Sequence, residues 1–72
     1  MAINPVLLMQ VEIMNQYIER KKLTIQEFLS IDAKYGFLDY IKTGYEPFHL
    51  MGDQGILNEI EDYIESNKQA SS

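Results

Sequence analysis

Apolar residues recur at helical spacing along most of this chain, and no segment alternates with the period of two that strands show. From Pro5 to Lys21 one broad arc of a helix would be apolar and the other polar. Asn4 before Pro5 is typical of a helix start, because asparagine caps the first turn and proline fits the first helical position. We therefore predict an amphipathic helix over residues 5–21.

Two residues interrupt the pattern of this first helix. Gln10 falls within the apolar arc, and Leu8 falls within the polar arc. Together with Met9 and Ile3, Leu8 is typical of the edge of a protein interface, although a single exposed leucine needs no such explanation.

A second helix is predicted to follow residue 24 and to end near Lys34. Thr24 and Glu27 form a capping box, and Gly36 supplies the left-handed residue that ends a helix. Asp32 lies inside the apolar arc. Because a buried carboxylate is costly without a partner, we expect Asp32 to cap the next segment, or to meet a tyrosine hydroxyl or a lysine.

Residues 37–50 are also predicted to be helical, although Pro47 lies inside them. Proline removes a backbone hydrogen bond and disfavours helical geometry at the residue before it. The segment is therefore either one helix kinked near Gly44–Pro47 or two short helices nearly in line. We favour the kink, because the apolar stripe keeps its phase across the proline.

The last helix is predicted over residues 54–67, after a glycine-containing turn in which Asp53 is the N-cap. The tail, residues 68–72, is expected to fray. Residues 1–72 thus form a single all-α domain with an ordered core of about residues 5–67. Its predicted architecture is a compact bundle of about four short helices.

Composition narrows the classes of function. The chain has 72 residues and no cysteine, which excludes a disulfide scaffold, thiolate zinc sites and a cysteine nucleophile. Its net charge of −5 argues against binding to a nucleic-acid backbone. No apolar stretch approaches the ~20 residues of a membrane span, and no signal peptide is recognised, so we expect a cytoplasmic protein. So short a chain buries only about 60% of its unfolded surface, which leaves a homodimer open.

Glu46 and His49 form the one pattern with a known chemistry, a glutamate three residues before a histidine. Such pairs hold metal in di-iron helical bundles, but the full site needs two of these pairs and two further glutamates. Because the chain has one histidine, we expect no metal and no cofactor. No nucleophile motif or phosphate loop is present, so we expect no catalytic residues and no enzymatic activity. His49 is then a structural or an interface residue.

Tyrosine is enriched in protein interfaces, and this chain has five tyrosines. Tyr40 lies at the border of its apolar stripe, where it can face a partner. The predicted partner-binding residues are Leu8, Met9, Tyr40, Tyr45 and His49.

The chain resembles a family of short bacterial proteins classed as a domain of unknown function, and the positions that carry the resemblance lie in its second half. The matching positions are Tyr35, Gly36, Leu38, Asp39, Tyr40, Ile41, Tyr45, Glu46, His49, Ile60, Tyr63 and Ile64. The resemblance covers residues 9–66, and Pro47 departs from the family's pattern. It implies a small cytoplasmic protein, encoded beside a protein that resembles an ADP-ribosyltransferase, in a toxin–antitoxin-like pair. No catalytic residue is carried over from the family.

Three hypotheses about function follow. The first is a small acidic interaction protein, the antitoxin-like or accessory partner of an ADP-ribosyltransferase-like enzyme, because an acidic surface speeds association with a basic partner. The second is a metal-binding or catalytic bundle that uses Glu46 and His49. The third is an acidic inhibitor that imitates nucleic acid, although the acids are spread over several helices.

Overall fold

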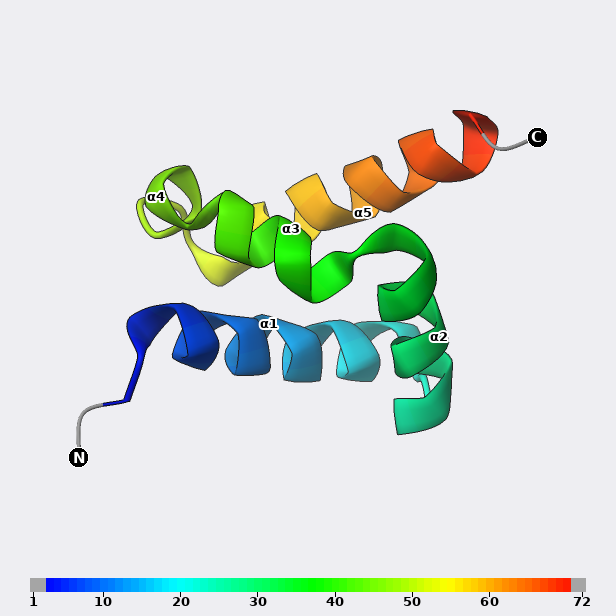
Figure 1. Cartoon of the computed structure of the whole chain (residues 1–72), viewed down its shortest axis with the longest axis horizontal. Helices are drawn as coiled ribbons and strands as arrows, with labels where there is room; N and C mark the ends of the chain where they lie inside the picture. Colours follow the sequence, from blue (N-terminus) through cyan, green and yellow to red (C-terminus); the bar gives the residue numbers. More distant parts are fainter. Residues whose placement is uncertain (1–2, 71–72) are drawn as a thin grey trace.

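The protein is all-helical in a computed structural model, which describes residues 3–70 of the chain. These residues contain no strand, and their secondary structure consists of α1 (Pro5–Lys21), α2 (Ile25–Tyr35), α3 (Phe37–Thr43), α4 (Tyr45–Phe48) and α5 (Asp53–Ala70). Figure 1 shows α1 along the bottom, α2 at its C-terminal end, α3 running back above α1, and α5 returning behind α3. The predicted all-α fold class is confirmed, but residues 3–70 form five helices rather than about four.

The first helix has the predicted bounds because both of its ends are capped locally. The Asn4 side chain accepts a hydrogen bond from the backbone N–H of Val6 at 2.8 Å. At the other end Lys22 adopts a left-handed conformation with φ 55°, and its N–H donates to the Glu19 carbonyl at 3.3 Å. Two basic residues in the last turn complement the negative end of the helix dipole.

The second helix begins with the predicted capping box. The Glu27 N–H donates to the Thr24 hydroxyl at 3.1 Å, and the Thr24 N–H donates to the Glu27 carboxylate at 2.8 Å. Gly36 ends α2 with φ 70°, a left-handed conformation that favours glycine. The Asp32 carboxylate accepts from the Leu38 N–H at 2.9 Å, which confirms that Asp32 caps the next segment.

The third predicted helix is divided in two, so the single kinked helix that we favoured is not observed. The break lies at Gly44, where φ −92° and ψ 13° leave helical geometry. Pro47 has no N–H to bond the Thr43 carbonyl, which weakens a continuous helix at this point. The apolar stripe keeps its phase because Ile41 in α3 and Phe48 in α4 are both buried in the same core.

The last helix begins one residue earlier than predicted and ends later. Asp53 is its first residue rather than its N-cap, and the Ile56 N–H donates to the Gly52 carbonyl at 3.1 Å. The Asp53 carboxylate instead accepts from the Gln16 side chain of α1 at 2.7 Å. The helix continues to Ala70, beyond the predicted end at residue 67. Fraying of residues 68–72 stays a prediction, and residues 71 and 72 lie outside the described range.

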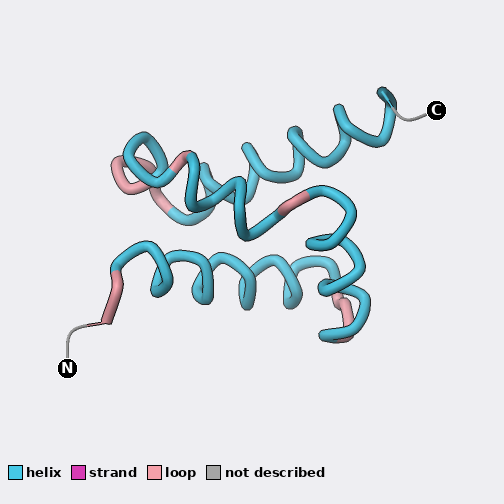
Figure 2. The backbone as a smooth tube through the Cα atoms, viewed as in Figure 1, coloured by secondary structure: helices cyan, strands magenta, loops and turns pink. Residues whose placement is uncertain are grey.

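The core lies where α1 packs against α3 and α5, and its centre is aromatic. The Phe37 ring centroid lies 4.8 Å from that of Tyr17 and 4.8 Å from that of Phe28. The other buried residues of the core are Ile13, Ile41, Phe48, Ile56, Leu57, Ile60 and Ile64. Gln10 is tolerated within the apolar arc of α1 because its side-chain amide donates a hydrogen bond to the Leu38 carbonyl at 2.8 Å. Figure 2 shows how short the connections between these helices are.

Candidate functional site

Four of the five residues predicted to bind a partner meet at one hollow on the surface. Leu8 and Met9 come from α1, Tyr45 comes from α4, and His49 follows α4 directly. The hollow has a volume of about 270 Å³, and its other lining residues are Pro5, Glu12, Met51, Asp53 and Ile56. We call it the α1–α4 hollow. The fold therefore unites residues that are distant in the sequence.

The apolar part of this hollow is only partly covered. Leu8 is 44% exposed and so lies where the helical pattern placed it, outside the core. Met9 is half-buried and packs against the core, so it joins the lining of the hollow to the interior of the protein. Met51 is also exposed, and Leu50 before it is 82% exposed. Exposed apolar side chains gathered at a concave site are typical of a protein-binding surface.

Tyr45 and His49 form a stacked pair at the hollow. Their ring centroids are 5.6 Å apart and their planes differ by 12°. The backbone N–H of His49 donates to the Tyr45 carbonyl at 2.8 Å, and this single helical turn brings the two rings together. His49 is exposed and Tyr45 is half-buried, so the pair offers a flat aromatic surface. Such a surface can bind an apolar side chain or a cation.

The charged residues of the α1–α4 hollow are acidic. Glu12 and Asp53 line it, and the described lining includes no lysine or arginine. Asp53 accepts a hydrogen bond from Gln16 at 2.7 Å, which orients the carboxylate without neutralising its charge. A hollow with apolar walls and carboxylates suits a lysine or arginine side chain, whose stem is apolar and whose head is charged.

Tyr40, the fifth predicted residue, is not part of this hollow. Its ring stacks on Tyr63 of α5 with centroids 4.0 Å apart, and it lies 5.5 Å from the ring of Phe48. Burial raises the pKa of the Tyr40 hydroxyl, and the negative charge of Glu59 raises it further. These contacts give Tyr40 a role in joining α3 to α5. Its role in partner binding stays a prediction.

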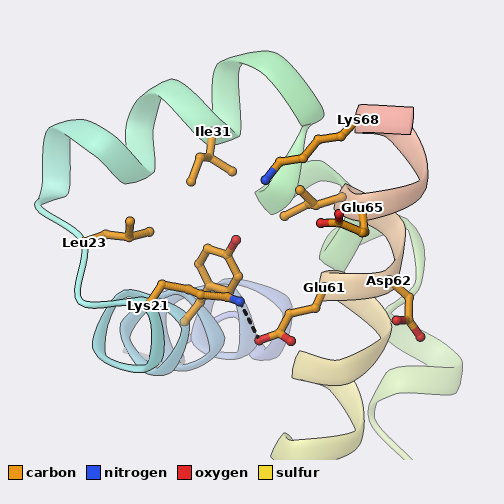
Figure 3. Close-up of a pocket in the computed structure, with 9 residues that line it drawn as sticks. Lys21, Leu23, Ile31, Glu61, Asp62, Glu65 and Lys68 are labelled. Atoms are coloured by element: carbon orange, nitrogen blue, oxygen red, sulfur yellow. Dashed lines mark ion pairs between the residues drawn. The ribbon is translucent and has the colours of Figure 1, made fainter. Parts of the chain in front are cut away.

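A second hollow, of about 380 Å³, lies between the end of α1, α2 and α5, and the sequence analysis did not predict it. Figure 3 shows Leu23 and Ile31 on one side of it, with Glu61, Glu65 and Lys68 on the other. The hollow forms only because α2 and α5 flank the same end of α1. No local pattern in the sequence indicates that arrangement.

One carboxylate at this second hollow is paired with two basic residues of α1. The Glu61 carboxylate lies 3.0 Å from the Arg20 guanidinium and 3.5 Å from the Lys21 ammonium. Burial raises the pKa of the Glu61 carboxyl, but the hydrogen bond from Arg20 and the charge of Lys21 outweigh burial and leave that pKa below its ordinary value. The charged lining residues of this hollow are of both signs, whereas those of the α1–α4 hollow are acidic, so the α1–α4 hollow favours a basic partner more clearly.

Glu46 and His49 are the residues of the metal-site hypothesis, and both are exposed. Over residues 3–70, no group of three or more histidine, cysteine, aspartate or glutamate side chains is placed to hold a metal ion. Glu12 and Asp53 therefore do not complete a metal site with His49, although they line the same hollow. In the part of the chain that the structure describes, no helix combines the length and apolar character needed to cross a bilayer.

A family model described as "Protein of unknown function (DUF3791)" matches residues 9–67, which is most of the chain. No curated protein and no solved structure shows a significant match.

Proposed function

The chain belongs to the DUF3791 family, and we propose that it is a small, acidic, non-enzymatic interaction protein that binds a basic segment of a partner protein at the α1–α4 hollow. The observation that carries this proposal is the composition of the hollow. Exposed apolar groups, a stacked aromatic pair and two carboxylates converge there.

The chemistry of the hollow favours one kind of occupant, a lysine or arginine next to an apolar residue of the partner. The stem of such a side chain would pack on Leu8 and Met9, and its charged head would lie near Glu12 and Asp53. A partly exposed ion pair contributes only about 0.2–1 kcal/mol, so the apolar contacts must supply much of the affinity. The carboxylates supply specificity for a basic residue.

The charge of the whole chain supports the same kind of partner. A net charge of −5 on 72 residues attracts a basic surface and raises the rate of association at low ionic strength. It also repels nucleic acid, so the basic partner that we propose is a protein.

As the partner we propose the ADP-ribosyltransferase-like protein that the family resemblance of residues 9–66 implies. This chain would restrain or assist that enzyme in an antitoxin-like or accessory role. Support for the class of partner comes from the resemblance, whereas support for the binding surface comes from the geometry of the hollow.

The acidic part of the proposal is tested by two matched charge reversals in α1. Glu12→Lys changes the hollow, and Glu19→Lys changes another exposed acid of the same helix. Each variant changes the net charge from −5 to −3, since one negative charge becomes one positive charge. Calorimetric titration with the ADP-ribosyltransferase-like protein encoded beside it should show binding weakened several-fold by Glu12→Lys and about twofold or less by Glu19→Lys. Equal weakening by both would overturn the site, and no binding by the natural chain would overturn the partner.

The apolar part is tested by a second matched pair. Leu8→Ser removes an exposed leucine from the hollow, and Leu29→Ser removes an exposed leucine from α2. Neither change creates a core cavity, so both variants should keep the helical circular dichroism spectrum of the natural chain. Leu8→Ser should weaken binding several-fold, and Leu29→Ser should leave it unchanged. The reverse result would place the partner on α2.

A further inference from the structure

The stacked rings of Tyr45 and His49 present an accessible aromatic surface at the α1–α4 hollow. Their planes differ by 12°, so each ring uses one of its faces for this contact. Over residues 3–70 neither ring stacks on a further aromatic side chain. His49 is exposed and directly follows the last residue of α4, so the outer face of its ring is accessible to another planar group.

The two carboxylates of the same hollow have acceptor oxygens to spare. Asp53 accepts the hydrogen bond from Gln16 on Oδ2 at 2.7 Å, and its Oδ1 accepts none from residues 3–70. The Glu12 carboxylate is exposed and forms no hydrogen bond or ion pair with the described residues. The hollow therefore combines an aromatic face with carboxylate oxygens that can accept hydrogen bonds from a partner.

An arginine side chain matches both of these features, whereas a lysine side chain matches only the carboxylates well. The guanidinium group is planar, stacks on aromatic rings and carries its five N–H donors in its own plane. Its face can therefore lie on a ring while its edge donates to carboxylates. The lysine ammonium is a compact and strongly hydrated charge that has no planar face.

We propose that the Tyr45–His49 pair makes the α1–α4 hollow select arginine over lysine. The guanidinium of the partner lies on the outer face of the His49 ring and donates from its edge to Asp53 and Glu12, which line the same hollow. This inference rests on the proposed function, because it names the basic residue that the partner supplies.

The size of the hollow fits one side chain of a partner. Its volume of about 270 Å³ is below the ~300–1,000 Å³ of pockets that enclose a drug-sized ligand. The aliphatic stem of the arginine packs on Leu8 and Met9, which line the hollow from α1. Met51 is 40% exposed at the same hollow and offers a contact for the apolar neighbour of that arginine.

The acids by themselves do not distinguish the two basic residues, because arginine and lysine each carry one positive charge. Discrimination therefore depends on the aromatic pair, and His49 is the member of the pair to change. His49 is exposed, so its replacement leaves no cavity in the core. Tyr45 is half-buried, and a change there would also affect folding.

Two tripeptides with capped ends, leucine–arginine–leucine and leucine–lysine–leucine, test the selectivity with the full chain. NMR titration of the isotope-labelled protein measures the Kd of each peptide and locates its site from the shifts of backbone amides. The arginine peptide should bind about two- to fivefold more tightly than the lysine peptide, the size of a cation–π contact at an exposed site. The largest shifts should fall on Glu12, His49 and Asp53.

Two variants of His49 separate the ring from its charge. His49→Leu keeps an apolar side chain but removes the planar ring, so the arginine peptide should bind only as well as the lysine peptide does. His49→Phe keeps a planar ring that carries no charge, so the preference for the arginine peptide should be retained.

The outcomes distinguish this inference from the proposed function. The selectivity is overturned by equal binding of the two peptides to the natural chain, by a preference that survives in His49→Leu, or by its loss in His49→Phe. Each of these results leaves the site for a basic residue in place. If neither peptide shifts the amides of the hollow, the site itself is overturned, and the proposed function fails with it.

Discussion

The Asp32 carboxylate accepts a hydrogen bond from the backbone N–H of Leu38 at 2.9 Å, and this contact joins the end of α2 to the first turn of α3. Gly36 separates the two helices and has no side chain that could cap α3. The first N–H groups of a helix lack partners within the helix. Asp32, which lies in the preceding helix, therefore caps the N-terminus of α3 in place of a local N-cap residue.

Removing this carboxylate should destabilise the protein. Asp32→Ala should lower the free energy of unfolding by about 1 kcal/mol, the typical cost of losing a cap. Asp32→Asn keeps an acceptor oxygen and should lose less. Urea unfolding followed by circular dichroism measures both, and an Asp32→Ala variant as stable as the natural chain would contradict the capping role.

The two short helices α3 and α4 meet at Gly44, where a methyl group would not fit. A Cβ at Gly44 would lie 2.7 Å from the ring of Phe48, and Phe48 is buried and cannot move away freely. Gly44→Ala should therefore lower the free energy of unfolding by about 1–3 kcal/mol. Gly52→Ala is the control, because a Cβ there meets no atom within 4 Å. It should be neutral or slightly stabilising in the same thermal or urea unfolding.

Glu61 should make the free energy of unfolding fall at low pH. Burial raises the pKa of its carboxyl, but the hydrogen bond from Arg20 and the charge of Lys21 prevail, so the folded pKa lies below the unfolded value of 4.5. A lowered folded pKa stabilises the protein above the unfolded pKa, and this contribution is lost as pH falls through the folded pKa. The natural chain should exceed Glu61→Gln in stability near pH 6, by about 1 kcal/mol or less, and the gap should shrink as pH falls below the unfolded value of 4.5 and through the folded pKa. A gap that does not change with pH would contradict the assignment.

Tyr17 should make the free energy of unfolding fall at high pH. Burial raises the pKa of its hydroxyl above the ordinary value of 10.0, and the charges of Glu61 and Glu65 raise it further. The unfolded chain then ionises first, so this contribution is complete below pH 10 and is lost as pH rises through the folded pKa. Tyr17→Phe should remove part of the fall in stability above pH 10. Absorbance of tyrosinate near 295 nm should show a tyrosine in the natural chain that ionises late and is missing from the variant.

Most helix ends could be predicted because they depend on near neighbours in the sequence. Asn4 caps α1, Thr24 and Glu27 cap α2, and Gly36 ends α2, and each of these contacts joins residues within about one helical turn. The same local reasoning found Asp32 out of place in its apolar arc and expected it to cap the next segment or to meet a tyrosine hydroxyl or a lysine, and the first of these is observed. It was wrong about Asp53, because the helix begins at that residue rather than after it.

The division between α3 and α4 was harder to predict because two local signals conflict. The continuous apolar stripe favours one helix, whereas Pro47 and Gly44 favour a break. The packing of Phe48 against Gly44, in a core that also contains residues of α1 and α5, decides between them. That packing depends on how distant helices come together, and periodicity does not contain this information.

The sequence by itself determined an all-helical, acidic, cysteine-free chain, most of its helix ends, and the residue types suited to binding a partner. Only the tertiary structure decided that Leu8, Met9, Tyr45 and His49 share one hollow with Glu12 and Asp53, and that Tyr40 packs on Tyr63 instead. The reason is physical. Helix geometry fixes the relation of each residue to those three or four positions away, but contacts between helices depend on how their buried faces pack together.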